Sequence, residues 1–97
     1  MRVDFNTVWQ QMFAKLERFR EEKRVGTVSY DETANAVVFH RDEQTNEYRY
    51  WIPFDELKSY EGQLKWIYHV RGKGWFDAKV MNDFLDVLEF LGLRPPT

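Results

Sequence analysis

The residues of this sequence most typical of a catalytic or metal site lie in the segment His40-Arg41-Asp42-Glu43. An imidazole beside two carboxylates is a combination that general bases and divalent-metal sites use. The same segment ends a run of strand-forming residues and leads into a polar turn, which is enough to account for its composition. We therefore interpret it as a solvated strand end.

Two further candidates for chemistry have a local pattern that fits other structure better. Glu56-Leu57-Lys58, with Asp42 upstream, is similar to the carboxylate–lysine pairing of some metal-dependent nucleases, but it follows Pro53 in a predicted helical turn instead of lying on a strand. His69 lies in an apolar helix without a second histidine three or four positions away. We predict no catalytic residue, no metal site and no cofactor. A metal-dependent hydrolase built on these carboxylates and His40 is the enzyme alternative.

The segment Arg71-Gly72-Lys73-Gly74-Trp75 combines two cations, two glycines and an indole. Cations and glycine amides can contact phosphate, and Trp75 offers a ring on which a base can stack. The segment also joins two predicted helices, and Gly72 is predicted there in a left-handed cap. Affinity for nucleic acid comes mostly from several phosphate contacts acting together, and two cations supply few. We favour a helix connector and keep a small nucleic-acid-binding domain as the alternative.

Aromatic side chains are the best candidates for contact with another protein. The chain has 4 Trp, 5 Tyr and 8 Phe, more than a core of this size can hide, and Trp, Tyr and Arg carry much of the binding energy of protein interfaces. The same rings could instead fill the core, and the pattern favours neither. The residues predicted to contact a partner are Tyr48, Tyr50, Trp51, Trp66, Arg71, Lys73 and Trp75.

The elements that must position these residues follow from the hydrophobic periodicity. Apolar residues recur every three or four positions in residues 5–24, which predicts one long helix. They are Phe5, Val8, Trp9, Met12, Phe13, Leu16 and Phe19. Its opposite face mixes acidic and basic residues, which is typical of a solvated face with intrahelical ion pairs.

Residues 25–30, 36–41 and 47–52 are short, rich in β-branched and aromatic residues, and separated by polar turns, which predicts a three-stranded antiparallel meander. Alternation predicts one face formed by Val28, Tyr30, Val37, Phe39, Tyr48, Tyr50 and Ile52. His40 and Trp51 are predicted on the opposite face of their strands.

After Pro53 ends the last strand, one helical turn is predicted, followed by two helices capped by Ser59 and Asp77. Leu64 and Tyr68 belong to the predicted apolar set of the first. The whole chain, 1–97, is thus predicted to be a single α+β domain of order α-β-β-β-α-α, with the long N-terminal helix packed on the meander. Its parts are a helix (1–24), the meander (25–53), a helical part (54–92) and a tail (93–97).

Composition excludes several classes of function. The chain carries 14 Lys and Arg against 16 Asp and Glu, a net charge of -2, so no global field draws it to nucleic acid or to an anionic membrane. The absence of cysteine excludes disulfides and thiolate nucleophiles. No apolar stretch has the length of a signal peptide or a membrane span. We expect a cytoplasmic protein with no membrane partner, and a homo-oligomer is one arrangement open to it.

The second half of the chain resembles small uncharacterised proteins of bacteriophages and mobile elements, over residues 48–91. The resemblance rests on a strand ending in Tyr50-Trp51-Ile52-Pro53, a helix with the Trp and His of Leu64-Lys65-Trp66-Ile67-Tyr68-His69-Val70, and a closing helix opened by Lys73-Gly74-Trp75-Phe76. It implies a non-enzymatic accessory factor that binds a host protein, such as an anti-CRISPR-like inhibitor of a defence protein. It assigns no functional residue.

Overall fold

The computed structural model describes residues 5–93, with the side chains of residues 9–11 and 13–93. Predictions for the side chains of Phe5, Val8 and Met12 and for the tail from residue 94 lie outside this range. The elements are α1 (Phe5–Glu22), β1 (Arg24–Val25), β2 (Val28–Asp31), β3 (Ala36–His40), β4 (Tyr48–Pro53), the 3-10 turn η1 (Phe54–Leu57), α2 (Tyr60–Val70) and α3 (Ala78–Phe90). The predicted α+β class is confirmed. Within residues 5–93, no helix combines the length and apolar character needed to cross a membrane.

The sheet is antiparallel and has four strands, in the order β1-β2-β3-β4, so the prediction of three strands was wrong. Lys23 ends α1 in the left-handed region at φ 55°, and Gly26 turns the chain at φ 58°. Val25 therefore pairs with Val28 in a tight hairpin. The residue types from Val25 onward predict one continuous strand, and the positive φ angle of Gly26 divides it.

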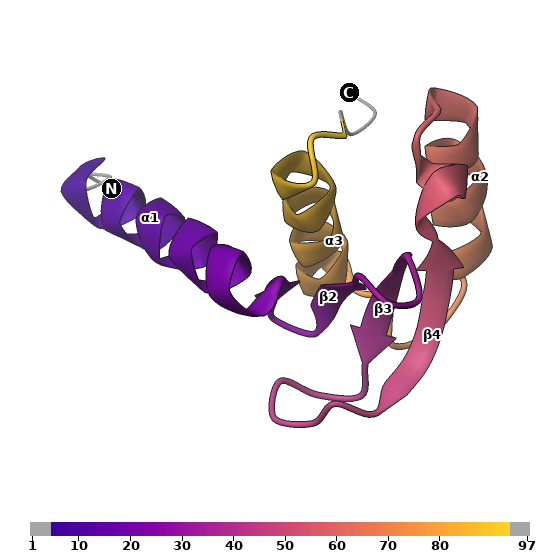
Figure 1. The fold of residues 1–97 in the computed structure, drawn as a ribbon, viewed down its shortest axis with the longest axis horizontal. Coiled ribbons are helices and arrows are strands. Elements are labelled where there is room, and N and C mark those ends of the chain that lie inside the picture. The colour runs from indigo at the N-terminus through magenta and orange to yellow at the C-terminus, as the bar shows by residue number, and fades with distance from the viewer. Residues whose placement is uncertain (1–4, 94–97) are drawn as a thin grey trace.

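α3, and not α1, covers the sheet. The core residues Phe84, Val87 and Leu88 of α3 pack against Val28, Val37, Phe39 and Ile52 of the sheet, whereas among the described side chains of α1 Phe19 alone belongs to the buried core. Figure 1 shows α3 beside the sheet and α1, in indigo, extending away from it toward the left. The predicted packing of the long helix on the meander is therefore wrong, and the more hydrophobic α3 occupies that place.

A β-bulge separates Tyr48 from the core face on which it was predicted. Phe39 pairs with Tyr50, but the next pair is His40 with Tyr48, so Arg49 is the additional residue. An extra residue in one strand reverses the alternation beyond it. Tyr48 consequently lies with His40 and Trp51 on the face that α3 does not cover, which we call the outer face.

The caps predicted for the two C-terminal helices are confirmed. The Ser59 hydroxyl accepts a hydrogen bond from the Gly62 amide at the start of α2. The Asp77 carboxylate accepts one from the Val80 amide at the start of α3. Capping satisfies amides that the first helical turn leaves unpaired, so these two short side chains determine where the helices begin.

Candidate partner-binding surface

The outward side of α2 carries a row of exposed large side chains. Tyr60, Leu64 and Tyr68 are 48%, 44% and 64% exposed, respectively, and their spacing of four residues places them on one side of the helix. We call these three residues the α2 stripe. The prediction that Leu64 and Tyr68 face the core is wrong, because Gln63 and Val70 occupy the buried side of this helix.

Beside the stripe, α2, β4 and the following loop bring three rings together. The ring centroid of Tyr50 lies 6.2 Å from that of Trp66 and 5.9 Å from that of Trp75. All three are half-buried and pack against the hydrophobic core. We call them the ring cluster. Burial raises the pKa of Tyr50, so its hydroxyl stays protonated and neutral at physiological pH.

Four cations surround this surface: Arg49, Lys65, Arg71 and Lys73. Three of them lie over rings, with Lys73 Nζ 5.0 Å from the Tyr50 centroid, the Arg49 guanidinium 5.4 Å from that of Trp75, and the Arg71 guanidinium 4.4 Å from that of Tyr68. Cation–π contacts of this kind orient the charged group and leave its charge unneutralised. Within residues 5–93, none of the four has a carboxylate within ion-pair distance. This cationic rim is therefore a local positive surface on a chain whose net charge is -2.

A hollow of about 430 Å³ joins the stripe to the ring cluster, lined by Lys65, Trp66, Tyr68 and His69. The Trp66 indole nitrogen is buried and has no hydrogen-bond partner within the described part of the chain. An unsatisfied buried N–H is costly, and most such groups in proteins have a partner in the protein or an ordered water. The surface is thus apolar at its centre and cationic at its edge.

The structure gathers five of the seven predicted partner-binding residues on this side of the molecule: Tyr50, Trp66, Arg71, Lys73 and Trp75. Tyr48 and Trp51 lie on the outer face, 47% and 58% exposed, respectively. The seven predicted residues are therefore divided between two faces of the molecule.

Prediction from sequence missed all three residues of the stripe, Tyr60, Leu64 and Tyr68, and two residues of the rim, Arg49 and Lys65. The interval of four residues between Tyr60, Leu64 and Tyr68 was a usable signal. To use this signal, one must decide which of the two apolar sides of this helix faces the solvent.

Neither glycine of the 71–75 segment has a positive φ angle. The prediction of a left-handed cap at Gly72 is wrong, because the glycines with positive φ among residues 5–93 are Gly26 and Gly92. A side chain at Gly72 or Gly74 would meet nothing within 4 Å. The segment therefore positions Lys73 and Trp75 without using the conformational freedom of its glycines.

The outer face carries a separate polar network. Tyr48 donates a hydrogen bond to the Asp31 carboxylate at 2.7 Å, which lowers the pKa of Asp31 and raises that of Tyr48. Since Asp31 is in β2 and Tyr48 in β4, the tyrosine side chain crosses β3 between them. Val38, in β3 on the same face, is 1% exposed although α3 does not cover this face.

His40 lies in the same network and is buried, so the prediction of a solvated strand end is wrong for this residue. Its Nε2 shares a hydrogen bond of 2.7 Å with Ser29 Oγ, and the two residues are 5% and 8% exposed, respectively. Burial lowers the pKa of His40, the charge of Arg24 adds to this shift, and the nearby Asn46 carbonyl opposes it. The histidine is therefore neutral in the folded protein at physiological pH.

The Ser29–His40 pair does not form a catalytic triad. Nδ1 of His40 is buried and has no hydrogen-bond partner within the described part of the chain, whereas a triad histidine is oriented by a carboxylate at this atom. Asp42 and Glu43 are exposed. The Asp42 carboxylate accepts hydrogen bonds from the backbone amides of residues 44 and 45, which stabilise the turn that begins at Asp42. Among residues 5–93, no three His, Asp or Glu side chains are placed to hold a metal ion.

Stability should fall as the pH drops below the ordinary pKa of histidine, about 6.5. The unfolded state then binds a proton that neutral, buried His40 resists, so this residue contributes at most about 1.4 kcal/mol of lost stability per pH unit. His40→Gln should flatten this slope in urea unfolding measured between neutral and mildly acidic pH. His69→Gln, at an exposed position, is the matched control, and equal slopes in both variants would contradict the assignment.

Comparison with known proteins yields no match to a family, to a curated protein or to a solved structure.

Proposed function

We propose that this chain is a small non-enzymatic protein-binding factor, encoded by a phage or mobile element, that inhibits a host defence protein as anti-CRISPR proteins do. Its partner would dock on the α2 stripe, the ring cluster and the cationic rim. The observation that carries the proposal is the exposed row Tyr60, Leu64 and Tyr68 bordered by cations that lack ion pairs among residues 5–93. Apolar centres with polar edges are typical of protein interfaces.

The chemistry of the rim indicates the kind of partner. Four cations around an apolar strip match a partner that presents carboxylates around its own apolar contact. Complementary charge of this kind accelerates and orients association, while the rings supply most of the affinity. We therefore expect binding that weakens moderately with salt and is not abolished by it.

Nucleic acid is the alternative for the same surface, through Arg71 to Trp75. A base stacks on an open aromatic face. Here Lys73 lies over Tyr50, Arg49 over Trp75 and Arg71 over Tyr68, so one face of each ring is already occupied. This arrangement favours a protein partner, and nucleic acid would instead show a steep dependence of affinity on salt.

The test is capture of partners from the lysate of a bacterial host by the tagged chain, with and without nuclease. We expect one or two stoichiometric proteins to survive nuclease with the native chain. The double variant Tyr68→Ala with Arg71→Ala should lose this capture by about tenfold or more, since both residue types are frequent interface anchors. Both side chains are exposed, so the melting temperature should change little.

Two comparison variants make the result specific to this surface. Arg41→Ala removes an equally exposed cation that pairs with Glu47 on the far loop, and it should capture the partner normally. Trp51→Ala removes an exposed ring from the outer face and should also be neutral. Loss of capture with Trp51→Ala alone would move the binding surface to the outer face, and loss after nuclease would favour nucleic acid.

A further inference from the structure

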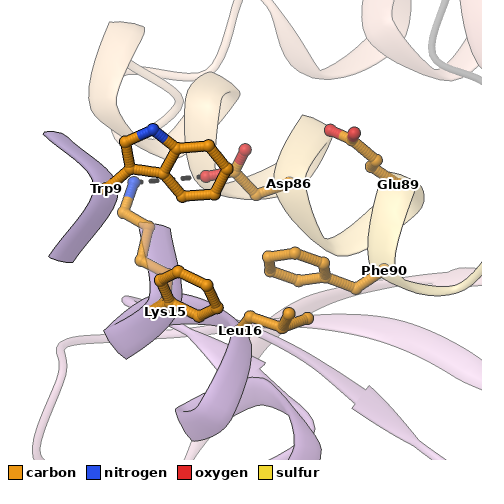
Figure 2. Close-up of a pocket in the computed structure, with 7 residues that line it drawn as sticks. Trp9, Lys15, Leu16, Asp86, Glu89 and Phe90 are labelled. Atoms are coloured by element: carbon orange, nitrogen blue, oxygen red, sulfur yellow. Dashed lines mark hydrogen bonds and ion pairs between the residues drawn. The ribbon is translucent and has the colours of Figure 1, made fainter. Parts of the chain in front are cut away.

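A groove separates α1 from the C-terminal end of α3. It has a volume of about 390 Å³ and is lined by Trp9, Phe13, Lys15, Leu16, Asp86, Glu89 and Phe90. Figure 2 shows Leu16 and Phe90 side by side, and Trp9 near the ion pair that Lys15 makes with Asp86 at 3.2 Å. The groove is therefore apolar inside and carries acidic groups on its α3 side.

Two large aromatic rings on α1 are exposed. Trp9 and Phe13 are 47% and 56% exposed, and their rings lie 5.5 Å apart, one turn from each other. Among the α1 side chains at positions 9–11 and 13–22, only Phe19, near the C-terminal end, belongs to the buried core. Helices in proteins gain most of their stability from packing an apolar face, so the exposed area of these two rings favours an additional partner for this side of α1.

We propose that the partner is a second copy of this chain. Two α1 helices would lie antiparallel about a two-fold axis, and each copy would place Trp9 and Phe13 in the groove of the other. In such an isologous contact the same residues of both copies take part. Each copy therefore supplies both the exposed rings and the groove that receives the rings of the other copy. The interface is distinct from the α2 surface and does not depend on the proposed function.

The distribution of charge along α1 supports the antiparallel orientation. Residues 5–14 carry no charged side chain, whereas residues 15–22 carry six. An antiparallel pair places the uncharged half of each helix in the groove of the other copy, whereas a parallel pair would set the two charged halves side by side. The amino end of a helix also bears partial positive charge. It would then approach Glu89 of the second copy, which is exposed and outside every ion pair of residues 5–93.

The area available is sufficient for a dimer of moderate affinity. A helix of this length extends about 27 Å, and half of its lateral surface amounts to about 500–600 Å² of accessible area. Two copies would together bury about 1,000–1,200 Å², which reaches the roughly 1,000 Å² expected of a biological interface but not the standard 1,600 Å². We therefore expect a dimer that dissociates on dilution.

Sedimentation equilibrium tests the proposal with the native chain from low micromolar to several hundred micromolar concentration. The mass should rise from that of the 11.8 kDa monomer toward twice that value. Trp9→Glu with Phe13→Glu should weaken association by about a hundredfold or more, because it places charge on two central anchors. Trp51→Glu makes the same change at an exposed ring on the outer face and should leave the dimer intact. A native chain that stays monomeric, or equal association of all three proteins, overturns the proposal.

Cross-linking checks the orientation without relying on the charged variants. In the antiparallel pair, Trp9 of one copy would face Leu16 of the other. The two-fold axis then passes midway between these positions, beside residues 12 and 13, so residue 13 of one copy lies close to residue 13 of the other. Since the chain has no cysteine, Phe13→Cys introduces the only thiol. Mild oxidation should yield a covalent dimer with Phe13→Cys and little with Trp51→Cys. Absence of the covalent dimer from Phe13→Cys, or equal yields from both variants, overturns the antiparallel arrangement.

Discussion

Phe39→Ala should remove about 3–5 kcal/mol from the free energy of unfolding, the usual cost of truncating a buried phenylalanine. Phe39 is 0% exposed. The centroid of its ring lies 5.3 Å from the ring centroid of Trp75, 5.6 Å from that of Phe84 and 5.9 Å from that of Phe76. A chain of this size has only about 5–15 kcal/mol in total, so the variant should be marginally stable. Urea unfolding followed by circular dichroism measures the loss.

Trp51→Ala is the control for this prediction. It removes a larger ring from the adjacent strand, but Trp51 lies on the outer face and is 58% exposed. Its loss should cost no more than about 1 kcal/mol, as is usual for exposed positions. Because Phe39 contacts both Tyr50 and Trp75 of the ring cluster, its truncation should also weaken partner binding. Equal losses of stability in the two variants would mean that the two faces of the sheet are wrongly assigned.

Gly62→Ala should destabilise the fold by about 3 kcal/mol, although alanine normally stabilises a helix relative to glycine. A side chain added at Gly62 would overlap the backbone carbonyl of Glu56, which belongs to η1 and cannot rotate away. Moving α2 to relieve the overlap would also strain the hydrogen bond of 3.0 Å between the Gly62 amide and the Ser59 hydroxyl. Chemical denaturation and the near-ultraviolet signal of the ring cluster both report this displacement.

Gly74→Ala and Gly72→Ala are matched controls for this substitution. Neither glycine has a positive φ, and an added side chain would meet nothing within 4 Å at either position. Both variants should change the free energy of unfolding by no more than about 0.5 kcal/mol, or raise it slightly by restricting the unfolded chain. If Gly62→Ala proved as stable as these controls, the close contact between η1 and α2 would be disproved.

The features that sequence alone determined are those that depend on neighbouring residues. The α+β class follows from the change of hydrophobic period after residue 24. The starts of α2 and α3 follow from Ser59 and Asp77, because a cap needs only a short polar side chain next to its own helix. Five of the predicted partner-binding residues come together for a similar reason, since β4, α2 and the loop after α2 follow one another along the chain.

Other features were decided only by the tertiary structure, because the local hydrophobic pattern fits two arrangements equally well. One bulged residue, Arg49, moved Tyr48 to the outer face, and a period of two gives no sign of such an insertion. The positive φ angle of Gly26 divided one predicted strand into a hairpin. Both changes are confined to single residues, yet the bulge alters which side chains face the core and the hairpin adds a strand to the sheet.

The same holds for the helices. α1 and α3 both have an apolar side, and the sheet has room for one of them, so competition for the same buried area determined that α3 packs there and α1 projects. α2 has apolar residues on two sides, and the side holding Val70 and Ile67 was buried while Tyr60, Leu64 and Tyr68 remained in water. Sequence determined which elements form and what each can offer. Burial, which depends on all elements at once, decided which surfaces are left for a partner.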